Sequence, residues 1–199
     1  GYENHPVGCV SWYGAVMFCN WLTCMRDGNA LNVVYASIDT TWKNTETVEN
    51  IAKSGYRLPS SMEFEYAARY RGSDSTNTVT GYSDPYLTKG DSASGATANV
   101  DDTTATSLVA VYGSGPAAVK SKSANNLGLY DMSGNVCEWC YGFVIVDGEP
   151  ETWCVVRGGD FFIPTLPGLK YYLMIGHTGS YDAERFDDNT VGFRFARTR

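Results

Sequence analysis

The stretch Gly128-Leu-Tyr-Asp-Met-Ser-Gly-Asn-Val-Cys-Glu-Trp-Cys140 changes character half-way along its length. Its first half contains residues that favour turns, among them Asp131 and Gly134. From Val136 onward the β-branched and aromatic residues of a strand predominate, and we predict a strand over Val136–Val146. Three further β-type runs follow between glycines and prolines: Trp153–Phe162, Lys170–Ile175 and Val191–Ala196.

The last of these runs has the period of two that is typical of a strand. Val191, Phe193 and Phe195 alternate with smaller or polar residues. Because successive side chains of a strand point to opposite faces, this run predicts a strand that is buried on one face.

Two amphipathic helices are predicted nearer the N-terminus. Ser11 can cap a helix that runs to Arg26, and Gly28 can end it. The second helix, over Leu58–Tyr70, begins with a capping box in which Ser60 and Glu63 satisfy each other's backbone amides.

The regions around these helices are predicted as a short strand and loops. Asn32–Ser37 has the composition of a strand, and Asp39–Asn50 that of an exposed loop or hairpin insertion. Residues 72–107 are rich in Gly, Ser, Thr, Asp and Asn and lack apolar periodicity, which indicates long loops. The prediction is one α+β domain over residues 1–199, with two helices, an irregular sheet and a high loop content.

Composition and charge exclude several classes of function. The chain has 199 residues, 43% of them hydrophobic, and a net charge of −7, so it can bury a core but lacks the positive field that nucleic acid selects. No apolar run approaches the length that crosses a bilayer, so we expect no nucleic-acid partner and no insertion into a membrane.

Six cysteines raise the question of disulfides and metal. A chain of this size does not need a disulfide framework, and cysteine is often buried, so free core thiols are favoured over disulfides. Cys137 and Cys140 form a CxxC motif, but Cys19 and Cys24 do not supply the matching second pair of a zinc site.

The ordered motifs of the chain resemble the formylglycine-generating enzyme, or sulfatase-modifying factor, family. They run from His5-Pro-Val through Tyr56-Arg-Leu-Pro-Ser60 and the quoted stretch to Val156-Arg-Gly-Gly159 and Gly192-Phe-Arg194. The resemblance implies a C-type-lectin-like fold with a small, irregular mixed sheet. The strands that usually precede His-Pro-Val in the family are missing, from which we expect a truncated or processed chain.

The resemblance also implies where catalytic groups should stand. In the enzymes of the family, two cysteines after Arg-Gly-Gly bind copper, and the matching positions here are Ile163 and Gly168. Thiolates suit Cu(I) and these side chains cannot replace them, so we predict no catalytic residues and no catalytic cofactor. Related iron enzymes rely on several histidines, whereas this chain has only His5 and His177. A formylglycine-type oxidase and a catalytically silent structural subunit remain the alternatives.

The segment of about 160–190 departs from the family between two matching motifs. It resembles the variable region of proteins that diversity-generating retroelements diversify, and this implies a ligand-binding display protein. Tyrosine, phenylalanine and histidine give a binding surface large contact area at low entropic cost. We predict exposed ligand-binding residues there, as against a reading in which the segment only fills the core: Phe162, Ile163, Tyr171, Tyr172, His177, Tyr181 and Phe186.

The resemblance places such a protein outside the cell or on its surface, as a lipoprotein anchored through a missing N-terminal region. Its partner would be an unknown protein or other surface ligand. It also implies a structural calcium ion, bound by the side chains of Asp131 and Glu138 with backbone oxygens of Met132, Gly134 and Val136. The alternative is that both acids are turn and strand residues that make ordinary hydrogen bonds.

Overall fold

A four-stranded mixed sheet forms the centre of the structure, a computed structural model that describes residues 3–36, 48–144, 153–165, 168–184 and 188–198. β7 pairs antiparallel with β6 and β8, whereas β6 and β9 run parallel, which confirms the mixed sheet. The strand order is β8 (Gly179–Asp182), β7 (Trp153–Arg157), β6 (Cys137–Val144) and β9 (Val191–Phe193).

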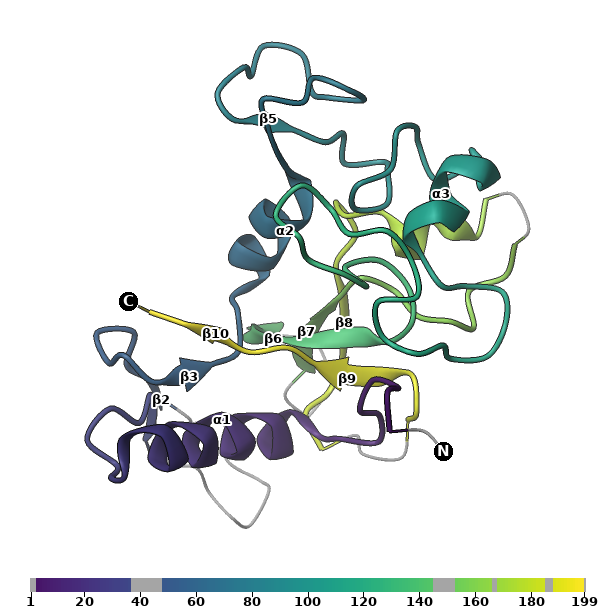
Figure 1. Ribbon diagram of the computed structural model, residues 1–199. Coiled ribbons are helices and arrows are strands. Elements are labelled where there is room, and N and C mark those ends of the chain that lie inside the picture. Colours follow the sequence, from purple (N-terminus) through teal and green to yellow (C-terminus); the bar gives the residue numbers. More distant parts are fainter. Residues whose placement is uncertain (1–2, 37–47, 145–152, 166–167, 185–187, 199) are drawn as a thin grey trace.

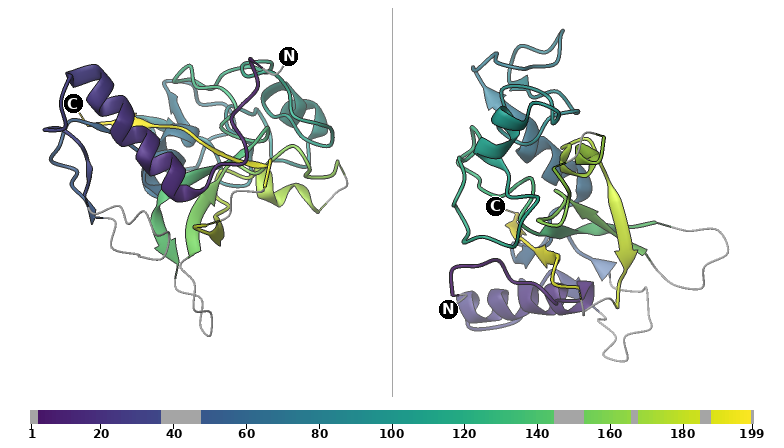
Figure 2. Two further views of the ribbon diagram at one scale, coloured as in Figure 1. Left: turned by 90° about the horizontal axis from the view of Figure 1, so that it is seen from below. Right: turned by 90° about the vertical axis from the view of Figure 1, so that its right-hand side faces the viewer.

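Helices cover both faces of this sheet. Cys137 and Trp139 of β6 pack into a core shared with α1 (Trp12–Asp27), while Cys140 packs against α2 (Ser61–Arg69). Because neighbouring side chains of a strand point in opposite directions, β6 holds one helix on each side, as Figures 1 and 2 show.

Both predicted helices form with the predicted caps. The Ser11 hydroxyl accepts from the Gly14 amide at 3.1 Å, and Gly28 ends α1 with a φ of 68°. The capping box of α2 joins the Glu63 amide to the Ser60 hydroxyl and the Ser60 amide to the Glu63 carboxylate. Each cap satisfies amides that the first helical turn leaves without a partner.

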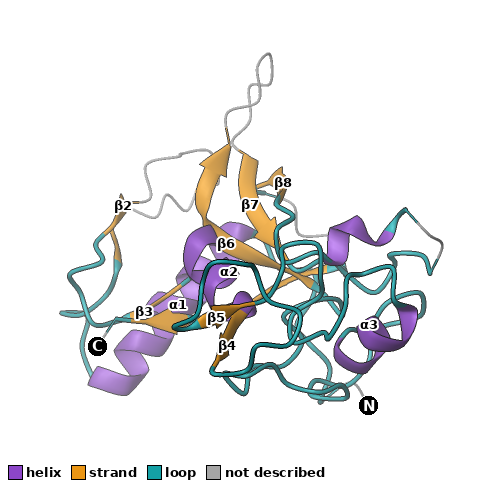
Figure 3. Cartoon of the chain, turned by 90° about the horizontal axis from the view of Figure 1, so that it is seen from above, coloured by secondary structure: helices purple, strands orange, loops and turns teal. Residues whose placement is uncertain are grey.

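Residues 72–107 contain more structure than predicted. Within or next to them lie β4 (Tyr70–Gly72), its antiparallel partner β5 (Tyr86–Leu87) and a third helix, α3 (Thr103–Val109). Asp102 caps α3 by accepting from the Ala105 amide at 2.9 Å. A helix of two turns is too short to show a clear apolar period, and the rest of the region is loop, as Figure 3 shows.

The predicted strand over Lys170–Ile175 is wrong, because the chain forms a 3₁₀ helix, η1 (Lys170–Leu173). Lys170 and Leu173 are buried and the two tyrosines between them are exposed, the spacing of three that a 3₁₀ helix gives. Loops satisfy the neighbouring backbone: the Ser133 hydroxyl donates to the Leu173 carbonyl, and the Ile175 amide donates to the Ser92 carbonyl.

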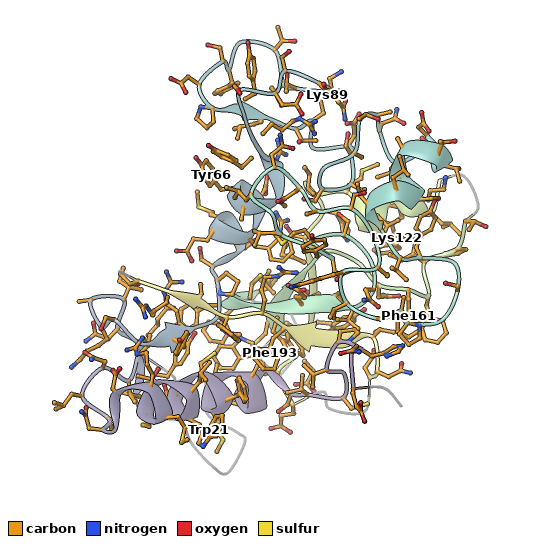
Figure 4. All side chains as sticks on the ribbon, in the orientation of Figure 1. Trp21, Tyr66, Lys89, Lys122, Phe161 and Phe193 are labelled. Carbon is orange, nitrogen blue, oxygen red and sulfur yellow. The ribbon has the colours of Figure 1, made fainter. Side chains whose placement is uncertain are left out.

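The predicted final strand is divided in two. After Phe193 the chain leaves the central sheet, and β10 (Ala196–Arg197) pairs antiparallel with β3 (Tyr56–Arg57). Phe195 is consequently exposed, with its ring 5.3 Å from that of Tyr56, so its predicted burial is wrong. Phe193 still packs on α1, 5.4 Å from the ring of Phe18, as its place in Figure 4 indicates.

The predicted hairpin insertion is described only at its base. β1 (Tyr35–Ala36) pairs antiparallel with β2 (Val48–Glu49), so the predicted strand over Asn32–Ser37 is shorter than expected. Residues 37–47, most of the Asp39–Asn50 insertion, lie outside the described residues.

The cysteines are free thiols, as predicted, and four of them are buried: Cys19, Cys137, Cys140 and Cys154. Burial raises the pKa of Cys19 to about 12 and raises those of the other three as well. They act as core residues. Among the described helices, none is long and apolar enough to cross a membrane.

Candidate ligand-binding site

The turn after β7 brings η1 against the central sheet. Gly158 and Gly159 have φ values of 95° and 67°, which favour glycine. A Cβ atom on Gly159 would lie 2.6 Å from the Tyr172 carbonyl oxygen and 2.7 Å from Cδ1 of Ile163. The absence of side chains therefore lets η1 approach the turn directly.

Arg157, the last residue of β7, holds the segment that follows η1. Its guanidinium is buried and donates to the carbonyls of His177 at 2.5 Å and Ile175 at 3.0 Å. It also donates to the Glu65 carboxylate of α2 at 2.6 Å. The positive charge is thus neutralised by a carboxylate from a different element, and His177 is fixed through its backbone.

An open pocket of about 220 Å³ lies over this turn. This volume is below that of most drug-sized ligand sites and suits one side chain or a small group. The walls come from the central strands, the glycine turn and η1: Cys137, Val156, Arg157, Gly158, Gly159, Asp160, Tyr172, His177, Gly179, Ser180 and Tyr181.

Three aromatic side chains cluster at the edge of this pocket: Tyr172 and His177 line it, and Tyr171 packs against both. The rings of Tyr171 and Tyr172 lie 4.0 Å apart, and His177 packs edge-on against them at 5.2 and 5.0 Å. Tyr171 is 37% exposed and Tyr172 is 43% exposed. The sequence singled out all three residues, and they form an open aromatic cluster. That they bind a ligand stays a prediction.

The pocket has acidic and neutral polar groups. Burial raises the pKa of the Asp160 carboxyl, and the nearby Asp188 adds to this effect, although an N–H from Phe162 opposes it. Burial also lowers the pKa of His177, with Arg157 as a second cause, so its imidazole is neutral near pH 7. The pocket thus offers a carboxylate, an imidazole and tyrosine rings to a ligand.

The other predicted binding residues are more scattered. Tyr181 lines the pocket from β8 and is half-buried, with its ring 6.3 Å from Trp139. Phe162 is 66% exposed but packs on Phe161, outside the pocket lining. Ile163 is only 5% exposed and packs in the core with Leu173, so its predicted exposure is wrong. Phe186 lies outside the described residues.

A match to a protein-family model identifies the family of this chain. The Sulfatase-modifying factor enzyme 1-like domain matches residues 1–199. The chain belongs to the sulfatase-modifying factor family. Its α+β structure, with helices on both faces of a mixed sheet, is the C-type-lectin-like fold that the motifs implied.

Solved structures and relatives with this fold carry different names. Treponema denticola variable protein 1 has a TM-score of 0.68 and 25% identity, with 99% of this chain and 72% of that chain covered. The structure of CarF has a TM-score of 0.61 and 26% identity, with 98% of this chain and 68% of that chain covered.

Among curated relatives, the chaperone protein LppX of Paenibacillus barcinonensis is 30% identical over 99% of this chain and 71% of LppX. The serine/threonine-protein kinase Pkn1 of Chlamydia trachomatis is 28% identical over 99% of this chain but only 25% of the kinase. The family domain therefore occurs in proteins of quite different size and name.

The two positions that resemble the copper ligands of the family's enzymes have no thiol. Ile163 is a buried aliphatic side chain, and Gly168 has a φ of 79° with open space where its Cβ would stand. The pocket contains one cysteine, Cys137, whose burial raises its pKa well above the usual range. Its thiol therefore stays protonated at neutral pH, a poor state for binding a soft metal.

The positively charged side chain of Arg194 already occupies the predicted calcium loop. The Glu138 carboxylate is buried and accepts from both Nε and Nη2 of Arg194, the latter at 2.6 Å. The same Nη2 lies 3.2 and 3.3 Å from the carbonyls of Tyr130 and Asp131, and the Asp131 carboxylate accepts from the Lys120 amide. These residues fit the alternative of ordinary hydrogen bonds better than a calcium site, because an ion would have to displace Arg194. The calcium ion stays a prediction.

The sequence analysis missed several pocket residues. Asp160 and Ser180 were not singled out, and Arg157 was noted only as part of a family motif. An aspartate directly after two glycines was an available signal for Asp160, since aspartate in a turn often accepts from the amide two residues on, as Asp160 does from Phe162 at 2.7 Å. Nothing in the sequence indicated that β8 would bring Ser180 to the same place.

Proposed function

We propose that this chain is a non-enzymatic ligand-binding module of the sulfatase-modifying factor family, with its binding surface in residues of about 160–190. One observation carries the proposal. Tyr171, Tyr172 and His177 form an open aromatic cluster at a pocket, in the segment that has lost the family's cysteines. Large aromatic groups left open to solvent are typical of sites that bind a partner.

A protein ligand suits this surface best. The pocket is small and lies beside a rim of tyrosines, so it can take one side chain while the rim contacts the surface around it. Among the relatives, one is named a chaperone protein, and a solved structure of the same fold is named a variable protein. Both names support a role in binding. As the family resemblance implies, we place this role at the cell surface or outside the cell, with an anchor elsewhere in the full protein.

The further proposal that a retroelement diversifies the segment is tested on DNA. The region downstream of the gene should contain a near-copy of the part that encodes residues of about 160–190, with mismatches confined to adenines of the copy. Gene copies from different isolates should differ at the codons of Tyr171, Tyr172, His177 and Tyr181. If these codons are invariant and no copy exists, diversification is excluded, although ligand binding is not.

The alternative of a formylglycine-type oxidase is tested by reaction. The protein, supplied with Cu(I) and oxygen, is incubated with a cysteine peptide of the sulfatase type, and mass spectrometry follows the peptide. We expect no aldehyde product, because Ile163 and Gly168 cannot hold copper. Formation of the aldehyde at many turnovers would overturn the proposal. A silent structural subunit would instead show no variation in gene copies and no tolerance of substitutions at the tyrosines.

A further inference from the structure

A second cavity lies beside Thr165 of the 160–190 segment and shares no lining residue with the pocket described above. It encloses about 370 Å³ and is formed by α3, the chain that follows it and Thr165. Six of its ten lining residues carry a hydroxyl, one is Lys122, and none is acidic: Thr103, Ser107, Ala110, Val111, Tyr112, Ser114, Ala117, Ser121, Lys122 and Thr165. This size is within the range of small-molecule sites.

A buried lysine lies behind the wall of this cavity, in contact with two of the residues that line it. Lys170, the first residue of η1, is 2% exposed. Its Nζ donates to the Thr103 hydroxyl at 2.8 Å and lies 6.0 Å from the centre of the Tyr112 ring, and both of those residues line the cavity. In the part of the chain that the structure describes, no carboxylate forms an ion pair with Lys170.

This arrangement differs from the other buried cations of the molecule. Arg157 pairs with Glu65, and Arg71 with Asp74, as expected from the high cost of burying an uncompensated charge. Among the residues that the structure describes, the side chain of Lys170 contacts a neutral hydroxyl and an aromatic ring but no carboxylate, and an ammonium has three donors. Lys122 adds a second positive charge at the cavity. The local charge there is therefore positive, whereas the chain as a whole has a net charge of −7.

We infer that this cavity binds an oxyanion, a phosphate or sulfate group, either free or as the monoester of a small hydroxyl-rich molecule. The two lysines supply positive charge, the serine and threonine hydroxyls can donate to the oxygens, and no carboxylate in the lining repels them. Lysine is a common phosphate ligand as a point charge. This site shares no lining residue with the pocket at the aromatic cluster. The anion-binding proposal and the proposed function can therefore be tested independently.

Isothermal titration calorimetry at constant ionic strength tests this inference. The probes are inorganic phosphate, inorganic sulfate, glucose 6-phosphate and, as the uncharged reference, glucose. Lys170→Met keeps the apolar stem and should weaken binding at least ten-fold, while Lys122→Gln at the half-buried rim should weaken it several-fold. Lys89→Gln is the matched control, because Lys89 is exposed and far from Lys122 in Figure 4, and it should bind as the wild type does.

Tighter binding of glucose 6-phosphate than of phosphate would identify a monoester, and equal binding a free anion. The inference is overturned if no anion binds saturably to the wild type, or if glucose binds as well as its phosphate. It is also overturned if Lys122→Gln leaves binding unchanged, a result that remains decisive should Lys170→Met fail to fold.

Discussion

Gly159 is the residue at which the fold and the proposed binding surface depend on one another. Its φ of 67° and the 2.6 Å that a Cβ would leave to the Tyr172 carbonyl make it both a backbone and a packing requirement. A glycine in the left-handed region is common in turns, whereas close approach of another backbone on the same side is a further constraint. The position of Tyr172 therefore follows from the lack of a side chain at Gly159.

We expect Gly159→Ala to destabilise the protein by about 2–3 kcal/mol, from backbone strain and the contact with Tyr172 together. Gly168→Ala is the matched control: its φ is 79°, but a Cβ there meets nothing within 4 Å. The control should lose only about 1 kcal/mol. Urea unfolding of both variants measures the difference, and equal losses would show that Tyr172 does not press on Gly159.

His177 should make stability depend on pH. Burial lowers its pKa in the folded state, while the unfolded value is about 6.5. As pH falls through about 6.5 and then through the lower folded pKa, the unfolded chain takes up the proton first, so stability is lost toward acid. We expect His177→Gln to lose less stability than the wild type between pH 7.5 and 5.0 in urea unfolding. Identical pH slopes would contradict a buried, neutral imidazole.

At the scale of elements, the loop before β6 and the strand β9 are joined through one ion pair. Arg194, just after β9, reaches the buried carboxylate of Glu138 on β6 and the carbonyls of the loop. A cation between a carboxylate and backbone oxygens is the arrangement that a calcium ion would otherwise supply. The protein thus stabilises this loop with a side chain from the far end of its sequence.

Arg194→Met should cost about 3–5 kcal/mol, because it leaves the Glu138 carboxylate buried without a cation. Arg197→Met, on the exposed surface of β10, should change stability by less than about 0.5 kcal/mol. Thermal unfolding measures both.

Thermal unfolding also tests whether the loop before β6 binds calcium. If Arg194 takes the place of the ion, the melting temperature is equal in calcium and in a chelator. A rise in calcium that Glu138→Gln abolishes would support an ion at this loop instead.

For the molecule as a whole, stability and proposed binding should reside in different residues. Alanine at Trp12, Leu58 or Trp139, all fully buried, should cost about 2–5 kcal/mol through the cavities left behind. Alanine at Tyr171 or Tyr172 should cost within about 0.5 kcal/mol, since both side chains are open to solvent.

Ile163 makes this comparison sharper. It belongs to the 160–190 segment but packs in the core, so Ile163→Ala should behave like the first group and lose about 2–5 kcal/mol. Melting curves and denaturant unfolding of the six variants provide the measurement. If the two tyrosines cost as much as Ile163, the segment is core throughout, and a silent structural role replaces the binding proposal.

Local signals in the sequence determined the two longest helices, α1 and α2, and the central strands β6 and β7 of this protein. The Ser11 and Ser60 caps act within three residues of themselves, so α1 and α2 could be placed without any knowledge of the fold. The runs Val136–Val146 and Trp153–Phe162 likewise contain the strands β6 and β7, although β7 already ends at Arg157. The loss of cysteine at Ile163 and Gly168 is a property of the sequence alone.

Only the tertiary structure decided which residues of the C-terminal segment are open and which are buried. Leu173 points inward and Tyr171 and Tyr172 outward because η1 is a 3₁₀ helix, and Ile163 is buried because it packs on Leu173. The backbone partners of Leu173 and Ile175, which are Ser133 and Ser92, come from distant loops. The position of Lys170 beside Thr103, 67 residues apart in the sequence, depends on tertiary packing in the same way. Contacts of this range are set by the packing of whole elements, and composition within a short window cannot specify them.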